Sequence, residues 1–270
     1  MKRQVHLILS ALSFYTRCPV PQRIHDNNAT LLPDAIRYLP VVGWISGIIS
    51  GFVYLSTAWF FGSAIGIIMA LIAGILFTGA FHEDGFADVC DGFGGGYTKD
   101  SILEIMKDSH LGTYGVIGLI LLLGVKFLAL YQALEGIIKQ SILHWDSVFT
   151  ILLVCIVAHS LSRFAAITVV FTHNYARISK SKVSNAVEKR KVKNLLLAAL
   201  FTLLPLTVLV LQTGIGLFAV IIIPVLGVAF VGGSYFKKHI GGYTGDCLGA
   251  VQQIAEVVIY LSFTMIWRFI

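Results

Sequence analysis

Residues 81–115 read FHEDGFADVCDGFGGGYTKDSILEIMKDSHLGTYG and lie between two long apolar stretches. They hold seven of the chain's 14 Asp and Glu residues. Asp84, Asp88 and Asp91 have the spacing i, i+4, i+7, which places three side chains on one face of a helix. Carboxylate oxygens suit Mg²⁺, a hard cation that usually bridges a protein to phosphate groups. The segment therefore predicts a cation site at one surface of a membrane.

The alternative for these aspartates is a solvated acidic helix end just outside the lipid. Three carboxylates on one face repel each other, so the arrangement costs stability unless a cation neutralises it. We favour the metal site. We expect the second apolar span to continue past Phe81 and to carry all three aspartates, until the glycines at 94–96 end the helix.

The composition is that of an all-α integral membrane protein. Of its 270 residues, 57% are hydrophobic and only 13% are charged, against about 25% charged residues in soluble domains. The four cysteines form no CxxC pair, which excludes a zinc site or disulfide framework of ordinary spacing. No repeat or linker interrupts the chain, so we expect residues 1–270 to form a single domain, without a nucleic-acid partner.

Seven apolar stretches are each close to the length of about 20 residues that crosses a bilayer. They are 40–61, 64–81, 113–133, 148–171, 195–212, 214–233 and 250–268. The joints at 61–63 and 212–214 are short enough for tight hairpins only. The first residues, MKRQVHLILSALSFY, are expected to lie at the membrane interface as an amphipathic segment.

The positive charges predict an orientation with the N-terminus in the cytoplasm and the C-terminus in the periplasm. With that orientation, 16 of the 20 Lys and Arg residues lie in cytoplasmic segments, as the positive-inside rule requires. The run at 177–193 is the strongest anchor. It acts as a topology signal or attracts anionic lipid, with a substrate role as the alternative. The acidic segment, this run and residues 234–249 all face the cytoplasm, which favours an enzyme at that surface.

Two further segments carry polar residues near predicted span ends. In MKDSHLGTYG, residues 106–115, Asp108 could complete a metal shell, and Lys107 or His110 could meet a phosphate oxygen. The alternative is a helix cap by Asp108 or Ser109. In GGYTGDCLGA, residues 241–250, a helix N-terminus favours an anion and Asp246 favours a cation. The alternative here is again a cap, formed by Thr244 or Asp246.

Charged residues inside the spans are costly and are functional candidates by default. His159 and Arg163 are four residues apart and share a helix face. The alternative for Arg163 is that its side chain extends to the nearby membrane surface. Lys126 lies nearer the middle of its span, and we expect it to pair with an acidic group such as Glu256 in the last span.

These pieces together resemble the cobalamin synthase family. The matching segments are FYTRCPVP at 14–21, FHEDGFADVCDGFGG at 81–95, ILEIMKDSHLGTYGV at 102–116, Ser162-Arg163, and GGYTGDCLGA at 241–250 followed by Glu256. They occur in the family's order and cover nearly the whole length. His110 departs from the pattern, since arginine is expected there.

The resemblance implies a transferase of the bacterial inner membrane that works on the cytoplasmic face. The 3′-hydroxyl of α-ribazole, or of α-ribazole 5′-phosphate, would attack adenosylcobinamide-GDP and release GMP, with Mg²⁺ as cofactor. Membrane lipid is a further expected partner, and a homo-oligomer is left open. We assign catalysis to Asp88, Asp91 and His82, substrate binding to Lys107, Arg163 and Thr244, and the metal to Asp84, Asp88, Asp91, Asp108 and Asp246.

Two rival functions belong to other classes. CDP-alcohol phosphotransferases also place aspartates at a span end, but their DGxxAR pattern fails here because Asp88 stands where the arginine belongs. A cation transporter would carry acidic groups inside its spans, whereas Glu256 is the only acidic residue of these spans, together with the basic Lys126 and Arg163 and, at the last position, Arg268.

Overall fold

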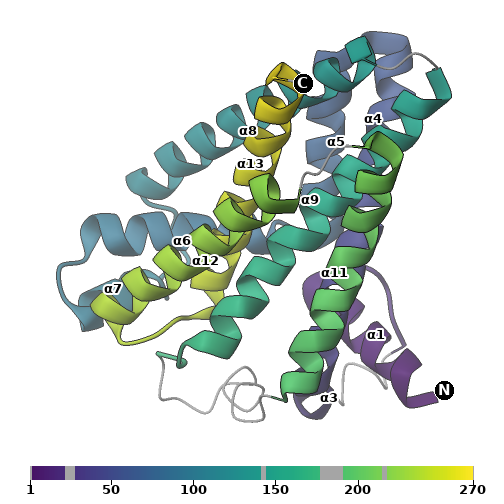
Figure 1. Cartoon of the computed structure of the whole chain (residues 1–270). Helices are drawn as coiled ribbons and strands as arrows, with labels where there is room; N and C mark the ends of the chain where they lie inside the picture. The colour runs from purple at the N-terminus through teal and green to yellow at the C-terminus, as the bar shows by residue number, and fades with distance from the viewer. Residues whose placement is uncertain (1, 22–27, 141–143, 177–190, 215–217, 270) are drawn as a thin grey trace.

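The computed structural model describes residues 2–21, 28–140, 144–176, 191–214 and 218–269, and within these ranges it is helical without a strand. The helices are α1 (Lys2–Tyr15), α3 (Asn28–Ala35), the 3-10 turn η1 (Ile36–Tyr38), α4 (Leu39–Phe61), α5 (Ser63–Thr78), α6 (Phe81–Gly95), α7 (Lys99–Ile105), α8 (Thr113–Gln140), α9 (His144–Thr172), α11 (Val192–Thr213), α12 (Phe218–Ile240) and α13 (Gly245–Phe269). Figure 1 shows the long helices as a tilted bundle with the two termini at opposite ends. The all-α prediction is confirmed.

Six stretches in the described part of the chain are long and apolar enough to cross a membrane, or seven if the bent pair α5–α6 counts as one. The spans predicted at 40–61, 113–133, 148–171, 195–212 and 250–268 each lie within one of these six stretches. The span predicted at 64–81 lies on α5 but runs past its last residue, Thr78. The span predicted at 214–233 is wrong in its bounds, because α12 begins at Phe218 and continues through Lys237 and Lys238 to Ile240. Most of the basic run at 177–193, and part of the joint after Thr213, lie outside the described residues.

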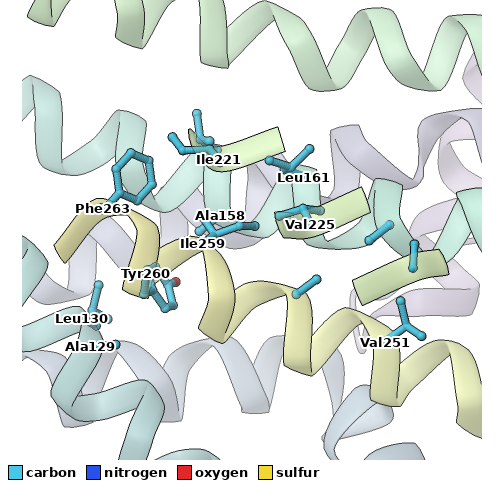
Figure 2. Packing of buried hydrophobic residues seen from close by; sticks show 14 of the residues in the cluster. Ala129, Leu130, Ala158, Leu161, Ile221, Val225, Val251, Ile259, Tyr260 and Phe263 are labelled. Atoms are coloured by element: carbon cyan, nitrogen blue, oxygen red, sulfur yellow. The ribbon is translucent and has the colours of Figure 1, made fainter. Parts of the chain in front are cut away.

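Two helices form the centre of the bundle. About 72% of the apolar window of both α9 and α13 is buried inside the protein, compared with 28% for α8 and α12. Their apolar side chains belong to one core cluster, and Figure 2 shows Ala158 of α9 beside Ile259 of α13, and Leu161 of α9 near Val225 of α12. Residues that are expensive to bury can therefore be enclosed here, on α9 and α13, away from lipid.

Helix α4 approaches α9 through small residues four apart. A Cβ added at Gly43 or Gly47 would overlap the α9 backbone at His159 and Ile156. Small residues at this spacing let two helix backbones come close together in a membrane protein, where van der Waals contact stabilises the pair. This contact holds α4 and its hairpin partner α5 against the central helix.

The helix predicted to run from the second span into the acidic segment is interrupted, which corrects that expectation. Gly79 and Ala80 both adopt the left-handed conformation, with φ of 67° and 58°. The Gly79 N–H donates to the Leu76 carbonyl (3.3 Å) and the Ala80 N–H to the Ile75 carbonyl (2.9 Å), the Schellman pattern that ends a helix. As a result α6 turns by 90° away from α5.

The α5–α6 break is held by the segment that follows α1. The Arg17 N–H donates to the Phe77 carbonyl at 2.8 Å. The Arg17 side chain occupies the space beside Gly79, where a Cβ would overlap it. Beyond the break, α6 packs against α13 and α8. We call this part of the molecule, which includes α6, α7 and the first turn of α13, the α6 end.

Candidate active site

The three aspartates of α6 differ in exposure. Asp84 is exposed, Asp88 is half-buried, and Asp91 is buried with 8% of its surface accessible. They lie on one helix, as their spacing predicts, and α6 packs along one side against α13 and α8. Asp84 and Asp88 are therefore the aspartates of this helix that a ligand can approach from solvent.

Asp91 is committed to the start of α8. Its two carboxylate oxygens accept the backbone N–H groups of Gly112 and Gly115, each at 2.8 Å. Both positions need glycine, because a Cβ at either would overlap the Asp91 carboxylate. A carboxylate at a helix N-terminus satisfies N–H groups that have no partner inside the helix. The catalytic and metal roles of Asp91 stay predictions beside this observed capping role.

Removing the Asp91 carboxylate should destabilise the protein. Asp91→Ala leaves two N–H groups of the α8 start without their acceptor, and we expect a loss of about 2 kcal/mol of unfolding free energy. Asp84→Ala, an exposed position two turns earlier, is the control and should change stability by less than about 0.5 kcal/mol. Denaturation in detergent micelles measures both. Equal stability of the two variants would contradict the capping role.

The glycine-rich segment at 241–250 meets α6 directly. A Cβ on Gly85 would lie 2.9 Å from the Asp246 Cα, and one on Gly249 would lie 3.0 Å from the His82 carbonyl oxygen. These small residues allow close contact, so Asp246 lies against the turn of α6 between Asp84 and Asp88. Sequence spacing alone gave no measure of this proximity, since Gly85 and Asp246 are far apart along the chain.

Thr244 caps α13, which confirms the alternative considered for it. Its Oγ1 accepts the Cys247 N–H at 3.3 Å and donates to the Asp246 carboxylate at 3.1 Å. The residue is fully buried. Its hydroxyl is thus engaged in orienting Asp246, and contact with a substrate stays a prediction.

The turn between α7 and α8 is exposed at Lys107, Asp108 and His110. The Asp108 carboxylate contacts the His110 Nδ1 at 2.6 Å and accepts the His110 N–H at 3.0 Å. This hydrogen bond lowers the pKa of Asp108 and raises the pKa of His110. His110 therefore keeps a positive charge to higher pH than a free histidine, closer to the arginine expected at this position.

The five carboxylates predicted to bind metal do not form a ready-made cluster. Within the described part of the chain, no three His, Cys, Asp or Glu side chains are arranged to hold a metal ion. Asp91 is turned to α8, and Asp108 is engaged with His110. Mg²⁺ commonly takes only one or two protein carboxylates together with waters and substrate phosphates. Asp84, Asp88 and Asp246, on two touching helices, fit that requirement, and Mg²⁺ stays a prediction.

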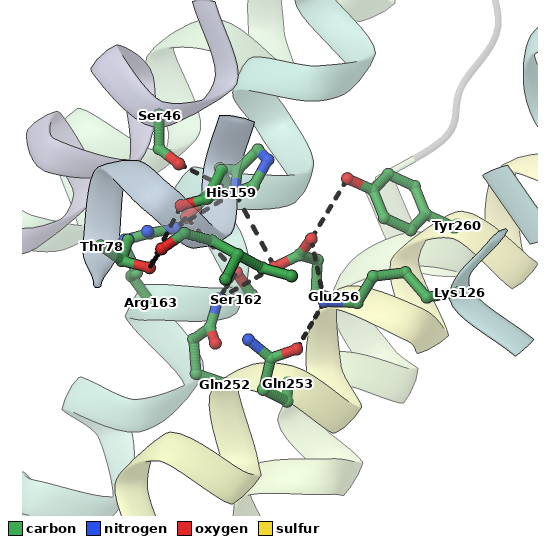
Figure 3. A network of polar contacts seen from close by, with 12 residues as sticks. Ser46, Thr78, Lys126, His159, Ser162, Arg163, Gln252, Gln253, Glu256 and Tyr260 are labelled. Carbon is green, nitrogen blue, oxygen red and sulfur yellow. Dashed lines mark hydrogen bonds and ion pairs between the residues drawn. The ribbon is translucent and has the colours of Figure 1, made fainter. Parts of the chain in front are cut away.

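A second polar group lies inside the bundle around Glu256 of α13 (Figure 3). Lys126 of α8 contacts the Glu256 carboxylate at 3.4 Å, which confirms the predicted pair. Lys126 also donates to the Gln253 Oε1 at 2.5 Å, and Gln252 donates to Glu256 at 3.0 Å. Tyr260 adds a hydrogen bond at 3.3 Å. Buried charges need such pairing and hydrogen bonding to be tolerated.

Arg163 of α9 belongs to the same region. Only 1% of its surface is accessible, so the alternative that it extends to the membrane surface is wrong. Its guanidinium donates to the His159 carbonyl at 2.8 Å, and the His159 ring lies 3.4 Å from the same nitrogen, as their shared face predicts. An arginine held this deep is positioned by the bundle rather than by solvent.

Sequence reasoning missed two residues at this site. The sequence assigned Glu83 no role, yet its Oε1 accepts the Gln253 side-chain N–H at 2.8 Å and joins α6 to the buried group. Arg17, from the segment at 14–21, is exposed beside the α5–α6 break. His82, predicted to be a catalytic residue, is 5% accessible. The 90° turn of α6, which no local pattern revealed, accounts for the inward placement of Glu83 and His82.

A cavity of about 30 Å³ lies among these buried groups. It is bordered by His82, Glu83, Lys126, His159, Arg163, Gln252, Gln253 and Glu256. Among the described residues, Glu83 Oε2, Arg163 Nε and Gln252 Oε1 have no hydrogen-bond partner. The volume suits about two waters. The cavity therefore has both the room and the donors and acceptors for solvent that would link α6 to the buried charges.

Comparison with known proteins relates this geometry to one family. The family model described as cobalamin-5-phosphate synthase, CobS, matches residues 7–264. A curated protein of Shewanella amazonensis (strain ATCC BAA-1098 / SB2B), named adenosylcobinamide-GDP ribazoletransferase, is 38% identical over 270 residues, covering 98% of this chain and 97% of its own length.

Proteins of the same name from other species give similar results. That of Shewanella frigidimarina (strain NCIMB 400) is 38% identical over 268 residues, with 96% of this chain and 94% of the relative covered. That of Shewanella piezotolerans (strain WP3 / JCM 13877) is 38% identical over 260 residues, with 96% and 95% covered. No solved structure matches the chain.

Proposed function

Because this chain belongs to the cobalamin-5-phosphate synthase (CobS) family, we propose that its α6 end joins α-ribazole, or α-ribazole 5′-phosphate, to adenosylcobinamide-GDP. The 3′-hydroxyl oxygen attacks the cobinamide-linked phosphorus, the bond from that phosphorus to the GMP oxygen breaks, and GMP leaves. The product is adenosylcobalamin or its 5′-phosphate. Family membership also excludes the CDP-alcohol phosphotransferase alternative.

The contact between Gly85 and Asp246 carries the assignment of the site. It places the carboxylates of α6 beside the first turn of α13, so that acidic side chains and a helix N-terminus share one location. A helix N-terminus favours phosphate and carboxylates favour a cation. A diphosphate with its counter-ion presents both requirements.

Individual residues then take separate tasks. Asp88 accepts the proton of the attacking hydroxyl, with His82 as the second candidate base. Lys107 and Arg163 stabilise phosphate charge, since phosphoryl transfer depends mainly on positioning and electrostatics. Asp84, Asp88 and Asp246 would hold Mg²⁺, which neutralises diphosphate charge and helps the leaving group depart. Thr244 orients Asp246 through its 3.1 Å hydrogen bond.

The site would face the cytoplasm of a bacterial inner membrane, with the N-terminus on that side and the C-terminus in the periplasm. The support is that 16 of the 20 Lys and Arg residues lie in segments at this side when the spans are placed in that orientation. With this orientation, α6 lies along the membrane surface because of its 90° turn from α5.

The activity can be tested with the purified protein in detergent micelles. Release of GMP from adenosylcobinamide-GDP should require α-ribazole or its 5′-phosphate and added MgCl₂, and excess EDTA should abolish it. Measuring cation flux with the same protein in sealed vesicles tests the transporter alternative. Cation flux without formation of GMP in either preparation would overturn the enzyme assignment. GMP release that persists in EDTA would support the transferase activity and reject Mg²⁺ as its cofactor.

A further inference from the structure

A second cavity, of about 90 Å³, lies beside the proposed site and under the end of α1. It is separate from the small polar cavity, although His82, Arg163 and Gln252 border both. Its remaining lining is apolar and comes from α1, α6, α9, α13 and the α3–α4 connection. Apart from His82 and Arg163, the residues that border this cavity have no task in the reaction proposed above.

Aromatic rings form one side of this cavity. Phe14 lies with its ring centroid 4.8 Å from that of Tyr15 and 5.7 Å from that of Phe81, and Tyr15 lies 5.9 Å from Phe81, all in edge-to-face arrangements. Phe81 is 41% exposed, so the cavity reaches the protein surface at this ring. Edges and faces of aromatic rings favour a further flat aromatic group. Phe14 and Tyr15 also belong to the segment at 14–21, in which only the Arg17 side chain has been given a role so far.

The inner side of the cavity is polar. Arg163 and Gln252 are each 1% accessible, and Arg163 Nε and Gln252 Oε1 have no hydrogen-bond partner among the described residues. Buried polar atoms of this kind are usually satisfied by a ligand or by water. Arg163 Nε is a donor and Gln252 Oε1 an acceptor. Both cavities border Arg163 and Gln252, so water in the small polar cavity is one partner for these atoms. From the second cavity an acyl chain offers them no hydrogen bond, whereas a heterocycle with a ring nitrogen offers the donor an acceptor.

We propose that this cavity binds the flat two-ring aromatic base of the ribazole nucleoside, with its unsubstituted ring nitrogen toward Arg163. The proposal rests on the proposed function, because ribazole is the acceptor there. The cavity volume corresponds to several waters, so the base would fill the cavity and extend outward past the exposed ring of Phe81. Its lining includes Gly245, the neighbour of Asp246, and His82, two residues before Asp84. A base bound here therefore places its ribose beside the carboxylates.

The test measures binding of free 5,6-dimethylbenzimidazole to the full chain in micelles, together with steady-state kinetics. Ala166 is 6% accessible and lines the cavity, so Ala166→Leu fills it. We expect this variant to weaken benzimidazole binding and to raise the KM for α-ribazole, each at least tenfold, while the KM for adenosylcobinamide-GDP changes less than twofold. Phe14→Leu, which keeps an apolar side chain but removes a ring, should weaken binding about threefold to tenfold.

Ala229→Leu is the matched control. Ala229 is 4% accessible on α12 and borders a different groove, so its enlargement should leave benzimidazole binding and both KM values unchanged. Wild-type protein that fails to bind the benzimidazole, or Phe14→Leu and Ala166→Leu variants that bind it as well as wild type, would overturn the proposal. If the Ala166→Leu variant does not fold, benzimidazole binding by the Phe14→Leu variant decides the test. Benzimidazole binding without any GMP release would support the cavity proposal and reject the transferase function. Failure of the cavity proposal can therefore be told apart from failure of the proposed function.

Discussion

Asp84→Asn should lower kcat/KM by at least about a hundredfold while leaving stability unchanged. The variant keeps the shape of the side chain and removes one negative charge at an exposed position, so folding has little reason to respond. Loss of one group that stabilises charge in a transition state commonly costs a factor of about 10² to 10³. Asp88→Asn should lose at least as much, because Asp88 is also the proposed base.

The matched control is Glu104→Gln, an exposed acid of α7 that has no assigned role. It should retain turnover within about twofold. Titration with MgCl₂ separates a metal ligand from a general electrostatic effect. Asp84→Asn should need more Mg²⁺ to reach its reduced maximum, whereas Glu104→Gln should follow the wild-type curve. Near-normal turnover of Asp84→Asn with an unchanged Mg²⁺ dependence would remove this residue from the site.

The second large effect concerns the buried pair of Lys126 and Glu256. Both residues are at most 3% accessible, and each is the main charge partner of the other. Removing one member leaves a charge without compensation inside the bundle, which typically costs about 3–5 kcal/mol. We therefore expect Lys126→Met and Glu256→Gln each to lower the unfolding free energy by about 3 kcal/mol.

The double variant Lys126→Met/Glu256→Gln should lose less than the sum of the single losses, by about 1–3 kcal/mol, because neither charge remains. Lys139→Met on the same helix is the control, since Lys139 is exposed and should contribute less than about 0.5 kcal/mol. Unfolding in micelles provides all four values. Additive losses would mean that the contact at 3.4 Å contributes nothing measurable to stability.

Strong local patterns predicted most of the fold. Long apolar runs located the spans because the bilayer demands a minimum length. The pairing of Lys126 with Glu256 followed from the cost of leaving either charge alone in a span. Arg163 was named as a functional candidate on the same ground, with extension to the membrane surface as the alternative. In each case this sequence offers few ways to satisfy the physical requirement, which is either the length needed to cross the bilayer or the pairing of a charge inside it.

What could not be predicted depends on contacts between distant segments. The α5–α6 break depends on two consecutive left-handed residues and on Arg17, which comes from far upstream. An alanine at position 80 gives no signal for that conformation. The turn then decides that Glu83 and His82 point inward. The capping role of Asp91 requires Gly112 and Gly115, more than 20 residues later, to arrive at the same place.

The length of α5 has a consequence for the surrounding lipid. Its 16 residues extend over about 24 Å, less than the roughly 30 Å of a typical hydrocarbon core. If α6 lies along the surface as proposed, α5 offers the lipid a shorter apolar wall than α4, whose 23 residues extend over about 35 Å. The bilayer around it should thin to match. Headgroups would then be drawn down toward α6, so that water-soluble substrates meet the carboxylates without crossing the full depth of a leaflet.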